Sequence, residues 1–274
     1  MRSTRGTDDT FDYVIVGAGS AGCVLAARLS EDPAVSVCLL EAGDRDKSPL
    51  LHVPLGIALV VPWPIHNWAF STVPQPGLDG RRGYQPRGKT LGGSSSINAM
   101  VYTRGHRSDY DGWAALGNTG WAYADVLPYF RRAENNERLA DEFHGRGGPL
   151  NVADPRSPSG FAELWLAAAE NQGIKRNLDF NGADQEGIGY YQVTQKCGER
   201  WSAAGAYLAP SLGRTNLDVR TRAHATRVIF DGRRAVGVEY RSGDGGVRSV
   251  RARRETILSG GALQKNLRGL EDFA

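Results

Sequence analysis

The sequence predicts an α/β fold that begins with a parallel βαβ unit, and three observations support this prediction. A short apolar run, residues 11–16, leads directly into a glycine-rich turn. Residues 21–31 then space their apolar side chains as an amphipathic helix does. Residues 35–41 form a second apolar run, which ends in Glu41. A strand, a helix and a strand in this order place the two strands parallel in one sheet.

The turn between the first strand and the helix has the spacing Gly-x-Gly-x-x-Gly. Gly17 permits the tight turn, Gly19 lets a diphosphate approach the backbone, and Gly22 lets the helix pack closely on the strand. The helix N-terminus adds unpaired N–H groups and a partial positive charge. Glu41 is placed to accept hydrogen bonds from ribose hydroxyls. The pattern predicts a dinucleotide site, and a glycine-rich turn without a ligand is the alternative.

Composition and charge argue against several other classes of function. The chain carries 33 basic and 30 acidic residues, and its arginine clusters lack interleaved aromatic residues, which favours a solvated surface over a nucleic-acid site. The cysteines Cys23, Cys38 and Cys197 have neither disulfide nor zinc spacing, so we expect no metal site. Residues 1–10 show no signal peptide, and the apolar run 53–61 is too short to span a bilayer. We therefore expect a cytoplasmic protein with no membrane span.

The middle of the chain predicts loops and helices. Residues 45–86 are rich in proline and are expected to form a covering loop. Residues 109–135 predict two short helices, with Asp125 as an N-cap and Pro128 in the first turn of the second helix. Residues 157–173 predict a further helix that begins at a serine and ends at a glycine.

The last third of the chain predicts strands separated by turns. The expected strands are 216–221, 226–230, 235–240, 247–252 and 255–262. Because the turns between them are short and contain Asp-Gly and Gly-Gly pairs, these strands are expected to form an antiparallel meander.

A second glycine segment, residues 87–98, reads Arg-Gly-Lys-Thr-Leu-Gly-Gly-Ser-Ser-Ser-Ile-Asn. Such small residues are unfavourable in a helix or a strand, so the backbone here is expected to approach something closely. Consecutive backbone N–H groups in such a turn form an anion cradle that needs no formal charge.

With these motifs in place, the chain resembles the glucose-methanol-choline (GMC) oxidoreductases, most closely their choline and alcohol dehydrogenase-like branch. The resemblance lies mainly in residues 12–44 and 87–118, with shorter matches at 142–158, 179–196 and 198–210. It implies a Rossmann-like FAD-binding domain with part of an antiparallel-sheet substrate domain, truncated at its C-terminus. The implied domain covers residues 10–274, with a Rossmann core at 11–44, a flavin-contact segment at 87–111, strands over 216–262 and incomplete substrate-domain elements around 150–210.

The resemblance also implies FAD as the cofactor. Together with the glycine pattern, it places these residues at the cofactor: Gly17, Gly19, Ser20, Ala21, Gly22, Glu41, Ala42, Trp68, Leu91, Gly92, Gly93, Ser94, Asn98, Ala99, Met100, Val101 and Ala225. Trp68 has ordinary packing as its alternative role. Some oxidases of the family carry a histidine that bonds to the flavin at the position of Ile97. Since isoleucine cannot form that bond, non-covalent FAD is expected.

The reaction implied by the family is oxidation of a small-molecule alcohol to an aldehyde, with hydride passing to flavin N5 and a histidine accepting the hydroxyl proton. No catalytic residue is assigned, because none of the five histidines matches the catalytic position: His52, His66, His106, His144 and His224. The family pattern holds to about Gln264 and departs at Lys265 and Asn266. We therefore expect the chain alone to fold poorly or to bind FAD weakly, and not to oxidise alcohols.

Two alternatives stay open on the sequence alone. One is an inactive flavin-binding remnant or the product of a non-functional truncated gene. The other is an NAD(P)-binding reductase that uses only the βαβ unit, although the second glycine segment argues against it. The sequence does not identify the alcohol, the electron acceptor or the oligomeric state.

Overall fold

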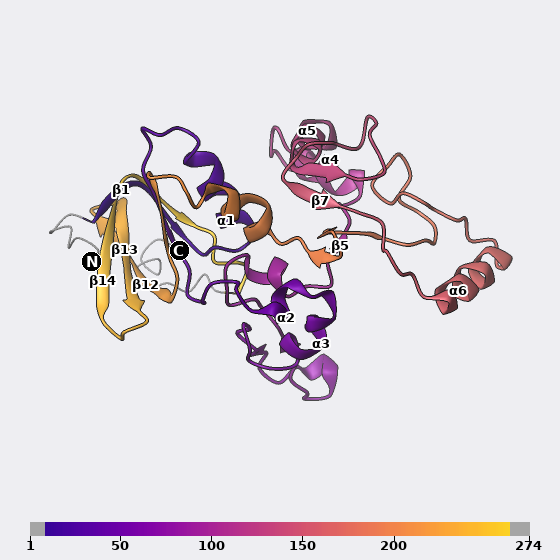
Figure 1. Cartoon of the computed structure of the whole chain (residues 1–274), viewed down its shortest axis with the longest axis horizontal. Helices are drawn as coiled ribbons and strands as arrows, with labels where there is room; N and C mark the ends of the chain where they lie inside the picture. The colour runs from indigo at the N-terminus through magenta and orange to yellow at the C-terminus, as the bar shows by residue number, and fades with distance from the viewer. Residues whose placement is uncertain (1–8, 264–274) are drawn as a thin grey trace. The chain divides into compact units, whose positions relative to one another are not determined.

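The structure, a computed structural model, describes residues 9–263 of the chain. The departure from the family pattern at Lys265 and Asn266 lies outside these residues. The chain divides into two compact units, the first made of Met1–Asn98 and Ser202–Ala274 and the second of Ala99–Trp201. The colours in Figure 1 follow the chain through both units, each of which is described by itself below.

The first unit is built on a six-stranded sheet with the order β11-β2-β1-β14-β13-β12. Its strands are β1 (Thr10–Val16), β2 (Val37–Leu40), β11 (Leu217–Arg220), β12 (Ala223–Asp231), β13 (Arg234–Ser242) and β14 (Val247–Leu258). The pairs β1–β2, β1–β14 and β2–β11 are parallel, whereas β12–β13 and β13–β14 are antiparallel. This mixed sheet confirms the expected α/β class.

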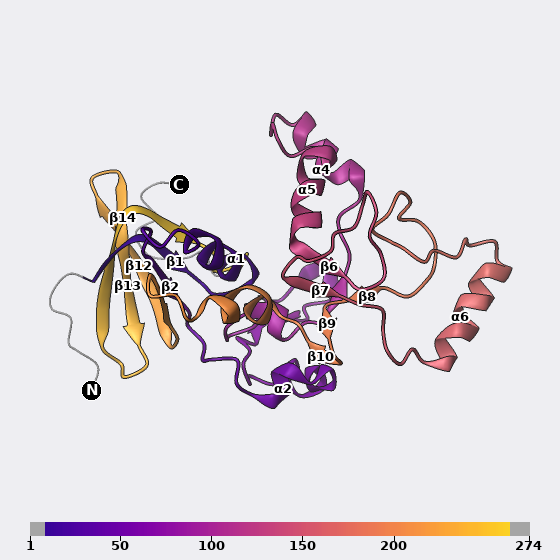
Figure 2. The same ribbon diagram turned by 45° about the horizontal axis from the view of Figure 1, so that its top comes forward.

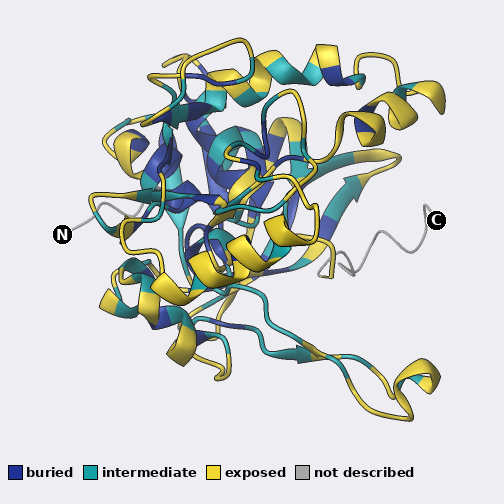
Figure 3. Cartoon of the chain, turned by 90° about the vertical axis from the view of Figure 1, so that its right-hand side faces the viewer, coloured by how far each residue is buried: buried dark blue, intermediate teal, exposed yellow. Residues whose placement is uncertain are grey.

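The βαβ unit at the start of the chain is confirmed by β1, helix α1 (Ser20–Leu29) and β2. Every residue of β2 is buried, and in Figure 3 the dark blue of the buried class is concentrated in the strands. Cys23 on α1 and Cys38 on β2 are both fully buried, as expected of small apolar side chains without metal or disulfide spacing.

Two expectations for the last third of the chain were wrong. Residues 216–221 do not join the meander, because β11 pairs in parallel with β2 instead. Residues 247–252 and 255–262 are not two strands, because β14 runs unbroken from Val247 to Leu258. The arginines that interrupt the apolar pattern there are exposed, and Arg253 forms an ion pair with Asp12 at 3.2 Å. Charged residues that point outward therefore concealed a continuous strand.

Residues 45–86 contain more regular structure than the expected loop. They form the one-turn helices α2 (Pro49–His52) and α3 (Ile57–Val60), the 3₁₀ turns η1 (Pro54–Gly56) and η2 (Pro76–Leu78), and the paired strands β3 (Phe70–Ser71) and β4 (Tyr84–Gln85). The glycine-serine segment after them contains a 3₁₀ turn, η3 (Gly93–Ser96). Later in the chain the first unit adds the π-helical turn η4 (Ala204–Leu208) and the 3₁₀ turn η5 (Ala209–Ser211).

The second unit contains three helices and several short strands. Its elements are β5 (Val101–Tyr102), α4 (Arg107–Ala115), α5 (Tyr123–Ala133), β6 (Glu134–Asn136), β7 (Leu150–Val152), α6 (Gly160–Asn171), β8 (Gln192–Val193), β9 (Gln195–Lys196) and β10 (Glu199–Arg200). Helices α4 and α5 pack together (Figure 2). Tyr110 of α4 contacts the rings of Tyr123 and Phe130 of α5. The expected pair of short helices is confirmed.

The ends of these helices agree with the sequence only in part. Helix α6 begins after Ser159, whose hydroxyl accepts the Phe161 N–H, and Gly173 follows the helix with φ of +82°. Asp125 is not the N-cap of α5. It is the third residue of the helix, and its carboxylate accepts the N–H of the N-cap residue Ala122 at 3.2 Å. Pro128 lies inside α5 and not in its first turn.

A buried cluster of charged side chains organises the second unit. His144 lies 3.1 Å from Glu134 through Nδ1 and 3.0 Å from Asp179 through Nε2, and Arg104 pairs with Glu134 at 2.9 Å. Burial opposes the protonation of His144, but its hydrogen bonds to Asp179 and Glu134 outweigh that effect and raise its pKa to about 9. His144 is therefore a buried structural cation.

Across residues 9–263, no helix has the length and apolar character that are needed to cross a bilayer.

Candidate functional site

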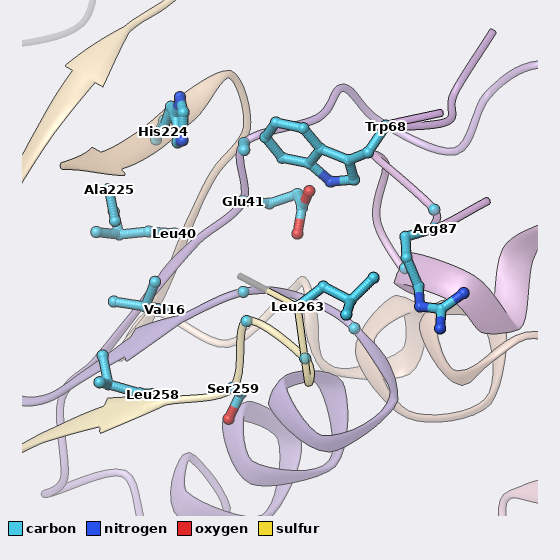
Figure 4. Close-up of a pocket in the computed structure, with 18 of the residues that line it drawn as sticks. Val16, Leu40, Glu41, Trp68, Arg87, His224, Ala225, Leu258, Ser259 and Leu263 are labelled. Atoms are coloured by element: carbon cyan, nitrogen blue, oxygen red, sulfur yellow. The ribbon is translucent and has the colours of Figure 1, made fainter. Parts of the chain in front are cut away.

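A cleft with a volume of about 1330 Å³ opens at the carboxyl ends of β1, β2 and β14 in the first unit (Figure 4). Its apolar floor includes Val16, Leu40 and Leu258, each at the end of its strand. Because parallel strands end at the same edge of a sheet, the loops that follow β1, β2 and β14 meet there. Ligands bind at this edge in open α/β sheets.

The glycine turn after β1 forms one wall of the cleft. Gly17 has φ of +93°, and a Cβ atom on it would come within 2.7 Å of the Ser259 carbonyl oxygen. A Cβ atom on Gly22 would overlap the Gly17 carbonyl oxygen, so this glycine lets α1 pack against the end of β1. By contrast, apart from Gly19 and its two chain neighbours, no atom of the described residues lies within 4 Å of the position that a Cβ atom would take on Gly19. Gly19 lines the cleft and leaves the start of α1 open to a ligand.

The second glycine segment touches the first. The Gly92 N–H donates a hydrogen bond to the Ala18 carbonyl at 2.8 Å. A Cβ atom on Gly93 would come within 2.7 Å of the Gly19 Cα, and Gly93 has φ of +53°. Only glycine satisfies both the contact and the backbone conformation without strain. Two segments that lie far apart in the sequence therefore form one continuous backbone surface.

Glu41 closes the cleft beside the first turn. Its side chain is buried, with Oε2 accepting the Ala18 N–H and Oε1 accepting the Gly43 N–H, both at 2.8 Å. Burial raises the pKa of this carboxyl, although the two amide hydrogen bonds act in the opposite direction. Each carboxylate oxygen can accept more than one hydrogen bond. Glu41 can therefore hold the glycine turn and also accept a hydrogen bond from a ligand hydroxyl.

Aromatic side chains line another part of the cleft. Trp68 stacks on Phe70 with ring centroids 5.6 Å apart, and its edge contact with His224 has a centroid separation of 5.5 Å. The Lys89 ammonium lies 4.2 Å from the centroid of the Trp68 ring. Burial lowers the pKa of His224, and the nearby charges of Lys89 and Arg241 lower it further. Figure 4 shows Trp68 above Glu41 and His224 above Ala225.

The structure brings most of the residues predicted at the cofactor to this cleft. Those that line it are Gly17, Gly19, Ser20, Ala21, Glu41, Ala42, Trp68, Gly93, Ser94 and Ala225. Gly22, Leu91, Gly92 and Asn98 belong to the same unit without lining the cleft. Ala99, Met100 and Val101 belong to the second unit.

A third turn, which was not predicted from the sequence, also lines the cleft. After β14 ends at Leu258, the Ser259 N–H donates to the Val16 carbonyl at 2.7 Å, which places Gly260 beside Gly17. The signal was present as a Gly-Gly pair directly after an apolar strand, but the expected strand 255–262 extended through it. His224 also lines the cleft and was not predicted there, and Arg87 lines it as the first residue of the expected flavin-contact segment 87–111, although it was not among the predicted cofactor-binding residues.

Comparison with known proteins agrees with this geometry. The GMC oxidoreductase family matches residues 11–266. An alcohol dehydrogenase [acceptor] from Pseudomonas putida is 53% identical over 231 residues, which cover 84% of this chain and 42% of that protein. Human mitochondrial choline dehydrogenase is 47% identical over 262 residues, which cover 93% of this chain and 44% of that protein.

Solved structures give the same result. Pyridoxine 4-oxidase from Mesorbium loti superposes with a TM-score of 0.87 at 34% identity, covering 92% of this chain and 50% of that one. An FAD-dependent oxidoreductase from Chaetomium thermophilum superposes with a TM-score of 0.85 at 31% identity, covering 92% and 45%. This chain spans about half the length of the curated relatives that it matches. The chain belongs to the GMC oxidoreductase family.

Proposed function

We propose that the cleft of the first unit binds FAD without a covalent bond, and that the chain supplies cofactor-binding residues of an oxidoreductase acting on the CH–OH group of a small-molecule alcohol. One observation carries the proposal. The close contact of Gly93 with Gly19 joins two glycine-rich turns into a single surface at the N-terminus of α1. A lone turn of this kind is common in many nucleotide-binding proteins, whereas this pair extends the surface along the cleft.

The residues around the cleft fit a dinucleotide. The open backbone at Gly19 and the start of α1 suit a diphosphate, because they offer N–H groups and the positive end of a helix dipole. Glu41 suits a ribose hydroxyl. Trp68 and His224 offer ring surfaces beside the short side chain of Ala225. These features support FAD, which the family and the FAD-dependent structural relative also imply.

The non-covalent attachment is supported by the surroundings of Ile97. This side chain is 3% exposed and packs with Leu51 and Val60 in an apolar cluster. An aliphatic side chain has no atom that can form a bond to a flavin ring. We therefore expect all flavin to leave the polypeptide when the protein is denatured by acid.

FAD, when bound, supplies the hydride acceptor for the oxidation of the alcohol. The contribution of this chain is to bind and orient the cofactor through the glycine turns and Glu41. None of the five histidines is assigned as the base, so we expect the 274-residue chain not to oxidise alcohols, even where it binds FAD weakly. The alcohol and choline dehydrogenases among the relatives support an alcohol as the substrate class.

The test is a titration of the purified 274-residue chain with FAD, followed by the quenching of flavin fluorescence. NAD and NADP serve as competitors, since a nicotinamide reductase would bind them in the same cleft. Saturable FAD binding that neither nucleotide displaces would support the proposal. Displacement by NAD, or the absence of FAD binding, would reject the proposed cofactor. Dye reduction by the FAD-loaded chain in the presence of alcohols would show that a catalytic base has been overlooked.

A further inference from the structure

We propose that Arg87 is a cofactor-binding residue whose guanidinium pairs with the diphosphate of the bound dinucleotide, an inference that rests on the proposed function. Arg87 is half-buried and lines the cleft. Its side chain donates to the Pro86 carbonyl at 2.6 Å through Nη1. Within residues 9–263 it forms no ion pair with a carboxylate. A cation in a cleft without an acidic partner is suited to an anionic ligand.

The position of Arg87 relative to the glycine turns follows from backbone contacts. Gly88, the next residue, lies so close to Gly93 that a Cβ atom would overlap the Gly93 carbonyl. Gly93 in turn lies against Gly19 at the start of α1. Arg87 is therefore attached to the part of the cleft where the backbone N–H groups converge. Figure 4 shows it on the opposite side of the pocket from His224 and Ala225.

The backbone of Arg87 is held from both sides. Its N–H donates to the Asn67 side-chain oxygen at 2.9 Å, and its carbonyl accepts the Trp68 N–H at 2.8 Å. Asn67 is itself buried, with only 4% of its surface exposed. Because the Cα position is fixed before a ligand arrives, less conformational entropy is lost when the guanidinium binds.

The other arginines of the cleft differ in their surroundings. Arg227 is paired with Glu239 at 3.2 Å. Arg241 is exposed on β13, where it pairs in register with His224 of β12. Arg241 thus belongs to the strand side of the cleft and not to the glycine turns. It provides a matched control, because replacing it removes a positive charge from the same cleft at a different place.

The experiment measures the binding of FAD, ADP and adenosine to the full 274-residue chain, with ADP and adenosine followed by competition against FAD. In Arg87→Gln, the dissociation constants of FAD and ADP are expected to rise about 10-fold, since a charge-assisted hydrogen bond is lost. Adenosine, which has no phosphate, is expected to bind as it does to the wild type. In Arg241→Gln, the ratio of ADP to adenosine affinity is expected to stay at the wild-type value.

A second variant distinguishes the loss of a phosphate contact from misfolding of the protein. Arg87→Lys keeps the positive charge but loses the planar guanidinium, which can bind a phosphate through two N–H groups at once. Its ADP affinity is therefore expected to lie between those of the wild type and Arg87→Gln. Added salt should weaken ADP binding to Arg87→Lys as much as it weakens binding to the wild type. In Arg87→Gln the ADP affinity should depend less on salt. An unchanged ADP affinity in Arg87→Gln, or an equal loss for ADP and adenosine, would overturn the assignment while leaving FAD binding intact. A wild-type chain that binds neither FAD nor ADP would instead reject the proposed function, and the role of Arg87 with it.

Discussion

The Gly92 N–H donates a hydrogen bond to the Ala18 carbonyl at 2.8 Å. This bond satisfies a carbonyl on a fully buried residue and ties the second glycine segment to the turn after β1. The Leu91 N–H adds a further bond to the Asp44 carbonyl at 3.1 Å. Because protein groups alone hold the two segments together, the surface that we propose for FAD exists before the ligand binds. The cost of arranging it is then part of folding and not of binding.

The contact of Gly93 with Gly19 gives the first prediction. Replacing Gly93 by alanine places a Cβ atom 2.7 Å from the Gly19 Cα and forces alanine to adopt φ of +53°. The backbone conformation alone costs about 1–2 kcal/mol, and the clash should separate the two turns. We expect FAD affinity to fall about 10-fold or more in a fluorescence titration. Gly77→Ala is the matched control, since a Cβ atom there meets nothing within 4 Å. Equal FAD affinities in the two variants would contradict the idea that this contact shapes the site.

Substitutions of the two later glycines of the first turn are expected to change different properties, the stability of the fold for Gly22 and the affinity for FAD for Gly19. In Gly22→Ala the new Cβ atom overlaps the Gly17 carbonyl oxygen, so α1 must move away from β1. We expect the free energy of unfolding to fall by about 1–3 kcal/mol even without FAD. In Gly19→Ala the Cβ atom meets no protein atom, so the unfolding free energy should change by less than about 1 kcal/mol. FAD binding should nevertheless weaken, because the methyl group would occupy the space that we propose for the diphosphate. Urea denaturation and FAD titration of both variants distinguish the two roles.

The sequence could predict elements whose signals are local. The strand, helix and strand that begin the chain were predicted because periodicity and glycine spacing lie within one short stretch. The same holds for α6, which lies between the cap Ser159 and Gly173. The parallel pairing of β11 with β2 and the continuity of β14 were not predictable in this way. They depend on partners distant in the sequence, and the exposed arginines of β14 hid its continuity.

The residues of the site also divide into those that a local sequence pattern identifies and those that only the tertiary structure brings to the cleft. The residues of the first glycine turn could be assigned because their roles follow from their spacing. His224 and the turn at Ser259 could not, because they reach the cleft only through tertiary pairing, and Arg87 fell within the expected flavin-contact segment 87–111 without being assigned a role of its own. Ser259 lies there because β14 pairs with β1 and ends level with it. No pattern within residues 255–262 specifies that register.

Glu41 gives the third prediction, because its two carboxylate oxygens each accept a backbone N–H. In Glu41→Gln one oxygen is replaced by an NH₂ group, which would face the N–H of Ala18 or of Gly43. A buried donor left without an acceptor costs about 1–3 kcal/mol. We therefore expect a lower free energy of unfolding without FAD, together with weaker FAD binding. Glu31→Gln should alter neither quantity, because Glu31 is exposed and its carboxylate pairs with the exposed Arg28 at the surface. An unfolding curve of Glu41→Gln identical to that of the wild type would show that the two amide bonds do not hold the turn.

The buried charge cluster of the second unit gives a prediction about pH. His144 has a pKa raised to about 9 and lies between the carboxylates of Glu134 and Asp179, while Arg104 pairs with Glu134. Burial raises the pKa values of both carboxyls, but the hydrogen bonds that each accepts, from His144 and from neighbouring N–H groups, together with nearby positive charges outweigh burial and lower both values. A histidine whose pKa is higher in the folded state binds its proton more tightly there than in the unfolded chain. Its contribution to stability is complete below the unfolded pKa of about 6.5 and is lost as the pH rises through about 9.

The free energy of unfolding of the second unit should therefore decrease between about pH 6.5 and pH 9. In His144→Asn the unfolding free energy at pH 7 should fall by about 3 kcal/mol or more, since two carboxylates lose a buried partner. The same variant should lose most of the decrease between pH 6.5 and pH 9, so its curve approaches that of the wild type at high pH. His106→Asn is the control, because His106 is an exposed N-cap of α4 and asparagine caps helices well. It should keep the wild-type pH dependence in denaturation followed by the fluorescence of Trp113 and Trp121. If His144→Asn kept that dependence as well, another group would have to titrate in this range, and His144 would not be the buried cation of the unit.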